Sequence, residues 1–350
     1  MKEDKLREIK EELRKTKYNK ATQHHIALLR ARLARLREER GTKSVRRGLR
    51  KVGDASVAIV GYPSVGKSTL LNALTNAYSK TGDYEFTTTE VTCGIMEYNK
   101  AKIQIFDAPG IIEGASMGRG KGKEILSFAR MADLILILVD NPDQIKSIEK
   151  ELHNSNFRLN KSAPKIKISK SYSGGINIIM PSNAGIDKKI VKEVLLKFKI
   201  YNADVVIEDN VAIEDVMDAI MGNCVYVPCI KVLNKIDKMS KEELAKARDV
   251  DVFISAKTGE NIDVLKKAIW ERLGLVRIYL KKIGKEPDMS SPLVFKGQPS
   301  VLNVAERIHS DIAENLRYAR IWGTSAKFDG QIVGGSYLLS DGDIVELHFK

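Results

Sequence analysis

Three absences in the 350-residue sequence limit the classes of protein to which it can belong. It has only three cysteines, Cys93, Cys224 and Cys229, without a C-x-x-C spacing, which excludes a disulfide framework and a cysteine metal site. The longest apolar run, Leu134–Val139, is far shorter than a membrane span, and the charged N-terminus lacks an apolar signal core. We therefore expect a soluble protein of a reducing, cytoplasmic compartment with no membrane partner.

The positive charge of the chain is concentrated near its N-terminus. Residues 1–51 hold 18 Lys and Arg against 7 Asp and Glu, a net charge of +11, whereas the remaining residues hold 40 against 38, a net of +2. Such a segment favours a polyanionic partner, either nucleic acid or an anionic membrane. The alternative is a solvated helix face without a binding role.

Residues 1–50 are predicted to form a basic helical hairpin. Two sets of apolar residues at helical spacing flank a polar break at residues 16–20. The first set is Leu6, Ile9 and Leu13, and the second is Ile26, Leu29, Leu33 and Leu36. Two helices that fold back along these narrow stripes would leave Lys and Arg on the outside.

Residues 54–275 show the pattern of an α/β domain. Short, nearly continuous apolar runs alternate with helical stretches, which predicts a mostly parallel sheet with helices on both faces. The expected strands are Val57–Val60, Ile103–Phe106, Leu134–Val139, Ile230–Leu233 and Val252–Ile254. Residues 160–225 exceed what one crossover needs, so we expect an inserted α+β subdomain there. Residues 276–350 predict a β-rich domain with one helix, entered through a strand and linker over 276–291.

The expected strand Val57–Val60 runs into a phosphate-binding loop. Residues 61–68 fit the pattern G-x-x-x-x-G-K-[ST], in which the glycines let backbone N–H groups surround phosphate oxygens. Lys67 would neutralise the β- and γ-phosphates and Ser68 would offer its hydroxyl to Mg²⁺. The expected nucleotide contacts are Gly61, Pro63, Ser64, Val65, Gly66, Lys67, Ser68 and Thr69. This loop alone does not separate ATP from GTP, or a kinase from a hydrolase.

Two further motifs concern the γ-phosphate and Mg²⁺. Asp107-Ala-Pro-Gly110 would supply a carboxylate for the metal and a glycine N–H for the γ-phosphate. One threonine of residues 87–89 should close over Mg²⁺, and we assign Thr88; Thr87 and Thr89 also fit an edge strand. The predicted metal set is thus Ser68, Thr88 and Asp107, and the predicted catalytic set is Lys67, Thr88 and Gly110.

Two motifs at later strand ends predict guanine. In Asn234-Lys235-Ile-Asp237, the aspartate can accept hydrogen bonds from guanine N1–H and the 2-amino group, donors that adenine does not present in that arrangement. In Ser255-Ala256-Lys257, the Ala256 N–H would face guanine O6. The phosphate loop, Asp-x-x-Gly, Asn-Lys-x-Asp and Ser-Ala-Lys occur in this order, each at the end of an expected strand, and together they predict a GTP site.

These motifs resemble the developmentally regulated GTP-binding proteins, a branch of the Obg family of translation-factor-class GTPases. The resemblance covers nearly the whole chain. It rests on Gly61–Ser68, Phe86–Thr88, Asp107–Ala115, Gly118–Gly122, Leu275–Tyr279 and Trp322–Lys327. An ATP-preferring branch of the same class departs from Asn-Lys-x-Asp, which this sequence keeps.

The resemblance implies four parts: the hairpin, a GTPase domain, an insertion similar to the second domain of ribosomal protein S5, and a C-terminal TGS domain with a β-grasp fold. It also implies association with ribosomes or RNA through the hairpin and the TGS domain, and leaves open a regulatory protein partner. We expect a monomer.

Two departures concern the mechanism. Ile111 stands where Ras-like enzymes carry the glutamine that orients the attacking water, and its side chain makes no hydrogen bonds. Some relatives hold K⁺ through an asparagine at the position of Ser64, so K⁺ stays open as a second cation beside Mg²⁺.

We therefore expect a slow Mg²⁺-dependent GTPase that converts GTP to GDP and phosphate and acts as a switch on ribosomes or RNA. The alternative is a nucleotide-gated RNA- or ribosome-binding scaffold with negligible hydrolysis. A small-molecule kinase fits less well, because it has no use for guanine-reading motifs or a basic appendage.

Overall fold

The computed structural model describes residues 53–75, 92–107 and 129–350, with isolated positions among the first 32. The chain divides into two compact units. One comprises Met1–Arg47 and Asn156–Tyr226, and the other Gly48–Ser155 and Val227–Lys350. Each unit is described by itself.

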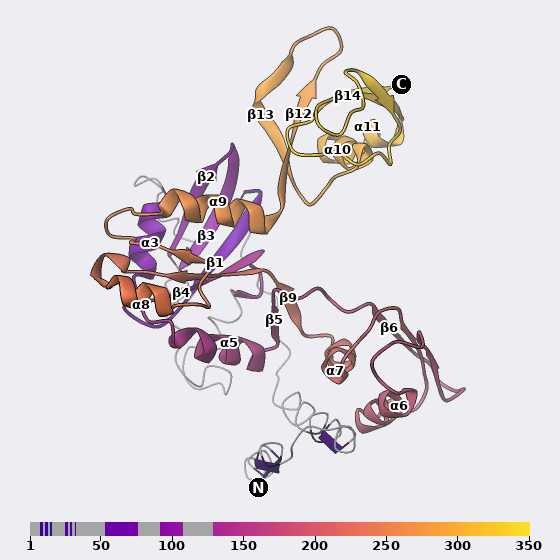
Figure 1. Cartoon of the computed structure of the whole chain (residues 1–350). Helices are drawn as coiled ribbons and strands as arrows, with labels where there is room; N and C mark the ends of the chain where they lie inside the picture. Colours follow the sequence, from indigo (N-terminus) through magenta and orange to yellow (C-terminus); the bar gives the residue numbers. More distant parts are fainter. Residues whose placement is uncertain are drawn as a thin grey trace. The chain divides into compact units, whose positions relative to one another are not determined.

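A six-stranded sheet forms the centre of the larger unit (Figure 1), in the order β11-β10-β4-β1-β3-β2. Its strands are β1 (Ala55–Val60), β2 (Thr92–Tyr98), β3 (Ala101–Asp107), β4 (Leu134–Val139), β10 (Cys229–Leu233) and β11 (Val252–Phe253). All neighbouring strands are parallel except β2, which pairs antiparallel with β3. The sequence analysis missed β2, because its alternation is interrupted by Gly94 and only Met96 and Gly94 are buried.

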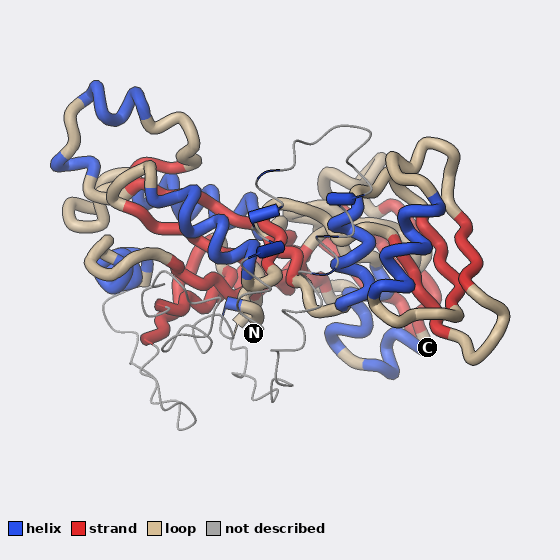
Figure 2. Tube along the Cα trace, turned by 90° about the horizontal axis from the view of Figure 1, so that it is seen from below, coloured by secondary structure: helices blue, strands red, loops and turns tan. Residues whose placement is uncertain are grey.

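Helices cover both faces of this sheet. Buried leucines and isoleucines of α3 (Lys67–Leu74) and α9 (Ile262–Leu273) share one core with alternate residues of β1, β3 and β4. On the other face, α5 (Gln144–Asn154) packs against β4 through Ile145, Ile148 and Leu152. The short α8 (Lys241–Lys246) lies between β10 and β11 in the chain order. Figure 2 shows the helices of the described chain in blue and its strands in red. Because β1 and β4 are covered on both sides, their sequences are continuous apolar runs.

The insertion has its own sheet and core. Strands β6 (Ile166–Lys170), β8 (Ala203–Ile207) and β7 (Ile176–Ile179) form a three-stranded sheet in that order. Helices α6 (Lys188–Lys197) and α7 (Ile213–Met221) pack on one face of it, and their apolar residues form a separate core. Residues 160–225, where we expect an α+β subdomain, contain these three strands and two helices.

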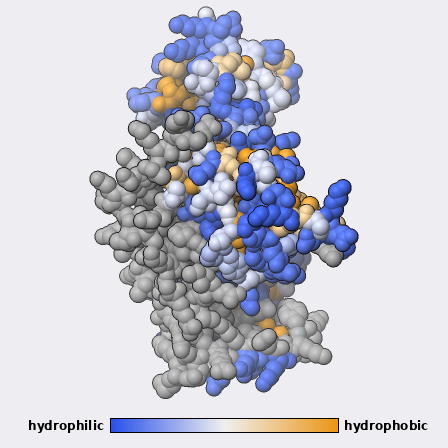
Figure 3. All heavy atoms as spheres, turned by 90° about the vertical axis from the view of Figure 1, so that its left-hand side faces the viewer, coloured by the Kyte–Doolittle hydropathy of each residue, from blue (hydrophilic) through white to orange (hydrophobic). Residues whose placement is uncertain are grey.

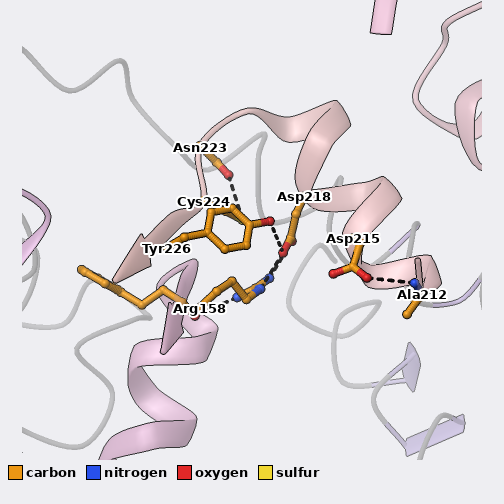
Figure 4. A network of polar contacts seen from close by, with 8 residues as sticks. Arg158, Ala212, Asp215, Asp218, Asn223, Cys224 and Tyr226 are labelled. Carbon is orange, nitrogen blue, oxygen red and sulfur yellow. Dashed lines mark hydrogen bonds and ion pairs between the residues drawn. The ribbon is translucent and has the colours of Figure 1, made fainter. Parts of the chain in front are cut away.

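A buried ion pair stands where the chain enters and leaves the insertion (Figure 4). Arg158, on β5 (Phe157–Leu159), donates two hydrogen bonds of 2.6 Å to the carboxylate of Asp218 on α7. The Tyr226 hydroxyl, on β9 (Val225–Val227), donates to the same carboxylate at 3.4 Å. Burial would lower the pKa of Arg158, but the hydrogen bonds and charge of Asp218 outweigh it and raise that pKa. The pair ties α7 to the β5–β9 ribbon.

The C-terminal residues form a five-stranded sheet in the order β13-β12-β16-β14-β15. The strands are β12 (Leu275–Lys281), β13 (Pro287–Lys296), β14 (Leu316–Trp322), β15 (Gln331–Val333) and β16 (Ile344–Phe349). Helix α10 (Val301–Ile308) packs on one face, and the short α11 (Ser310–Glu314) follows it. We predicted a linker that extends to residue 291, but residues 287–291 belong to β13. The chain turns at Gly284 (φ +72°), and β13 pairs back onto β12.

Most of the predicted N-terminal hairpin lies outside the described residues. The described positions are helical, and Ile9, Ile26 and Leu29 among them are buried. His25 Nε2 lies 3.0 Å from Glu12 Oε1, so these two helical positions lie side by side.

The described surface is mainly hydrophilic. Figure 3 shows small, separate hydrophobic areas on one face. Among the described residues, the exposed large hydrophobic side chains lie in the insertion, in α9 and in the C-terminal residues from Ile283 onward. No helix in the described part has both the length and the apolarity that crossing a bilayer requires.

The Arg158–Asp218 pair gives a stability prediction. Asp218→Asn should lower the free energy of unfolding by about 3–5 kcal/mol, because it leaves a buried guanidinium without its counter-charge. Urea denaturation followed by circular dichroism measures this. Asp209→Asn is the matched control, because the Lys165–Asp209 pair is exposed and 4.0 Å long, and it should change stability by about 0.5 kcal/mol or less. Equal effects of the two variants would contradict the assignment.

Candidate functional site: a phosphate loop bonded to the loops after β10 and β11

Two glycines give the loop between β1 and α3 its shape. A Cβ at Gly61 would lie 2.2 Å from the Leu138 carbonyl oxygen, so the loop passes too close to β4 for a side chain. Gly66 has φ +95°, and a Cβ there would lie 2.5 Å from Asn234 Nδ2. Gly66 also begins α3, whose N-terminal N–H groups and dipole favour a bound anion. The loop therefore has the backbone that a phosphate site needs.

Lys67 places a buried ammonium inside this loop. Its side chain donates to the carbonyl oxygens of Gly61 (3.3 Å) and Tyr62 (2.9 Å), and the residue is 8% exposed. Burial lowers its pKa, and the charge of Asp107 partly opposes that shift. A buried cation with neutral partners gains from an anionic phosphate group.

Asp107 ends β3 beside the start of α3. Its Oδ2 accepts a hydrogen bond from Ser68 Oγ at 2.6 Å, whereas its Oδ1 is buried without a hydrogen-bond partner among the described residues. Burial raises the pKa of Asp107, against the hydrogen bond from Ser68 and the charge of Lys67. The folded chain therefore holds the proton of Asp107 more tightly than the unfolded chain does. As the pH rises from the ordinary pKa of an aspartate to the raised one, the free energy of unfolding falls.

The donor set around Asp107 fits Mg²⁺. A carboxylate and a hydroxyl are oxygen ligands of the kind that this ion prefers, and it completes its shell with water and substrate phosphates. Within the described residues, no cluster of three or more His, Cys, Asp or Glu could hold a metal by itself. An ion at Ser68 and Asp107 would thus depend on the nucleotide.

Asn234 ties the phosphate loop to the loop after β11. Its amide Nδ2 donates to the Val65 carbonyl oxygen at 2.8 Å, and its Oδ1 accepts from the Ala256 N–H at 2.9 Å. Asn234 is 3% exposed, so both bonds are shielded from water. We predicted that the Ala256 N–H faces guanine O6; in the structure this N–H donates to Asn234, and the side chain of Asn234 acts as a brace.

Asp237 is exposed and oriented by one hydroxyl. The buried Ser255 donates to Asp237 Oδ1 at 2.7 Å, and this hydrogen bond is the main reason that the pKa of Asp237 is lowered. The carboxylate is therefore ionised at neutral pH. Its position at the rim of the site allows it to accept hydrogen bonds from a base.

The sequence analysis missed Asp140, which joins the two loops a second time. Lys235 Nζ donates to Asp140 Oδ2 at 2.7 Å and to the Ser64 carbonyl oxygen at 2.8 Å. Both Ser64 (φ +64°) and Lys235 (φ +67°) adopt left-handed backbone conformations. Asp140 directly follows β4, so its place at a strand end was the available signal.

The remaining predicted residues divide into two groups. Pro63, Thr69 and Lys257 lie in or beside the same loops with exposed side chains. Thr88 and Gly110, and with them Ile111, lie outside the described residues.

Comparison with protein-family models matches three successive segments. Residues 56–170 match the model described as 50S ribosome-binding GTPase, and residues 173–275 match the C-terminal region of the MMR_HSR1 domain. Residues 276–349 match the TGS domain.

Curated relatives match over almost the entire chain. An uncharacterized GTP-binding protein of Methanocaldococcus jannaschii is 46% identical, over 99% of this chain and 93% of its own. GTP-binding protein 1 of Schizosaccharomyces pombe is 42% identical over 99% of both chains. Developmentally-regulated GTP-binding protein 1 of Xenopus laevis is 42% identical over 98% of this chain and 97% of its own.

The chain belongs to the developmentally regulated GTP-binding proteins. The predicted family and fold class, a P-loop GTPase domain with a C-terminal TGS domain, are thereby confirmed. The hydrogen bonds of Asn234 and Lys235 hold the phosphate loop to the loops that follow β10 and β11.

The geometry of Asp237 predicts a change of nucleotide preference. Asp237→Asn turns one acceptor oxygen into a donor that would face the guanine 2-amino group, so affinity should shift from GDP to xanthosine diphosphate. Titration with fluorescent analogues of both nucleotides measures the shift. Asp249→Asn, an exposed aspartate that pairs with Lys231, is the matched control. Full GDP affinity without a gain for the xanthosine nucleotide would refute the role of Asp237.

Proposed function

We propose that this GTP-binding protein is a slow, Mg²⁺-dependent GTPase that acts as a nucleotide switch on ribosomes or RNA. The observation that carries the hydrolytic part is the juxtaposition of Lys67, Ser68 and Asp107 at the end of β3. Asp107 Oδ1 is buried and has no hydrogen-bond partner among the residues that the structure describes, and the Ser68 hydroxyl lies beside its carboxylate; both support a site for a cation. The buried ammonium of Lys67 supports a site for an anion. MgGTP supplies both.

The residues would divide the work as follows. Ser68 and Thr88 would hold Mg²⁺ directly and Asp107 through water, and the bound ion would neutralise charge that develops on the phosphates. Lys67 would exchange its carbonyl partners for the β- and γ-phosphates, and the Gly110 N–H would meet the γ-phosphate. Asp237 and the Ser255–Lys257 loop would hold the base, with Asn234 and Lys235 as braces.

Turnover without an activator should be slow. Ile111 contributes no hydrogen bond to the attacking water, so orientation of that water would depend on backbone groups or on a partner. Ser64 stands where some relatives carry the asparagine that holds K⁺, so activation of this protein by K⁺ is an open question. Replacement of Na⁺ by K⁺ in the hydrolysis buffer tests it. An unchanged rate would exclude it.

The rival function is a nucleotide-gated RNA- or ribosome-binding scaffold with negligible hydrolysis, and Ile111 favours it. A single-turnover phosphate-release assay with and without ribosomes separates the two. Measurable release that depends on Lys67 supports the GTPase, whereas binding without release supports the scaffold.

Charge and family description support the ribosome or RNA as partner. The net +11 of residues 1–51 suits a polyanion, and the model that matches residues 56–170 is described as a ribosome-binding GTPase. The proposed state is a cytoplasmic monomer that contacts RNA through the hairpin and the TGS domain. A regulatory protein would supply the group that orients the attacking water, because Ile111 cannot do so.

Thr88 provides a test of the catalytic proposal. Thr88→Ala should abolish hydrolysis and leave GDP affinity unchanged, because a switch threonine contacts Mg²⁺ only in the triphosphate complex. Single-turnover release with MgGTP and equilibrium binding of GDP measure the two effects. Thr87→Ala and Thr89→Ala are neighbouring controls that should keep most of the rate. Loss of both GDP and GTP binding would mark Thr88 as structural.

The basic hairpin provides a test of the partner. Deletion of residues 1–50 should weaken ribosome binding and flatten its salt dependence, by a log–log slope of roughly 0.7 for each single-strand phosphate that the hairpin neutralises. Ribosome pelleting at several salt concentrations measures both. If the arginines only solvate a helix face, the deletion will leave the slope unchanged and lower thermal stability instead.

A further inference from the structure

The C-terminal sheet has one face that α10 does not cover. The core residues of β12, β14, β15 and β16 point toward α10, so the alternate residues lie on the opposite face. Across this face, the register pairs Ile332 with Arg320 and Arg320 with Glu346, and in the next row Tyr318 with His348. Aromatic and cationic side chains therefore share a sheet surface.

Tyr318 and His348 form a stack of two rings on this face. Their centroids lie 4.4 Å apart, and their planes differ by 13°. His348 Nε2 lies 2.8 Å from Glu346 Oε1, and the buried Glu346 also accepts a hydrogen bond from Lys281. Burial would raise the pKa of Glu346, but the bonds from Lys281 and His348 lower it, so the carboxylate is ionised and holds the imidazole in place.

On the side of Tyr318 away from β16, the neighbouring strand β15 pairs Val333 with Ala319 and ends there. Continuation of this register would place Gly334 beside Tyr318, and we call the space beside Gly334 the notch. Gly334 is exposed, and a Cβ built on it would meet no atom within 4 Å. The exposed Ile332 and Arg320 flank the notch. Arg320 makes no ion pair or side-chain hydrogen bond with any part of the chain that the structure describes.

We propose that this notch binds an unpaired base of single-stranded RNA, which would stack on the free side of the Tyr318 ring and extend the Tyr318–His348 stack. Arg320 would contact the adjacent phosphate. A base has the flat, polarisable face that a parallel ring pair favours, and stacking needs no particular sequence. The exposed guanidinium of Arg320 beside the two rings favours an anionic chain over an apolar peptide, because it attracts phosphate charge. This inference rests on the proposed function, and names the RNA element that the TGS domain would contact.

The test uses the full chain and two labelled probes, a 12-nucleotide oligouridine and an RNA duplex of equal length. Tyr318→Leu should weaken oligouridine binding roughly tenfold, the effect of removing one stacked base, and leave duplex binding unchanged. Tyr318→Phe keeps the ring and should bind as the parent does. Tyr172→Leu is the matched control, because Tyr172 is fully exposed in the insertion. Thermal unfolding and GDP affinity verify that each variant is folded.

Arg320 adds an independent measurement. Arg320→Gln should reduce the salt slope of oligouridine binding by about 0.7, whereas Arg320→Lys should keep the slope. If the full chain binds oligouridine and Tyr318→Leu binds it equally well, the notch proposal fails and the RNA-binding function stands. If the full chain binds neither probe nor ribosomes, the proposed function fails as well. A loss of ribosome binding in Tyr318→Leu without any change toward oligouridine would assign the notch to a protein instead.

Discussion

The site depends on two opposite charges that the fold buries at the carboxyl ends of the parallel strands β1 and β3. Lys67 begins α3 and Asp107 ends β3, and the parallel pairing of β1 with β3 brings these two points together. Burial disfavours the charged form of both groups, since the pKa of Lys67 is lowered and that of Asp107 is raised. Their mutual attraction offsets only part of this cost. A phosphate and a divalent cation would satisfy both, so ligand binding also stabilises the fold.

Around these charges, hydrogen bonds join the phosphate loop to the loops after β10 and β11. Asn234 and Lys235 each bond a carbonyl of the phosphate loop, and they follow β10, two strands away from β1. A nucleotide that spans both loops thus meets partners already at a fixed distance, which lowers the entropic cost of binding. The three-stranded insertion and the C-terminal sheet each have a core of their own.

The sequence predicted the parts of the fold that periodicity and spacing determine. The buried parallel strands and the motifs at their ends were found, because continuous apolar runs and fixed tetrapeptides carry them. Strand β2 was missed, since an edge strand with Gly94 and a single buried side chain has no clear period. Long-range partners such as Asp140 with Lys235, and Ala256 with Asn234, could not be predicted, because they depend on side-chain directions at loops that only the folded chain brings together.

The measurement that tests the central claim most directly is the Mg²⁺ dependence of GTP affinity in Asp107→Asn. The amide keeps an acceptor for Ser68 but removes the charge that burial disfavours. We predict that GTP affinity of the variant no longer responds to Mg²⁺, while its melting temperature without nucleotide at neutral pH equals or exceeds that of the parent. A variant that retains the full Mg²⁺ response would contradict the account, because the buried carboxylate would then have no part in the metal site.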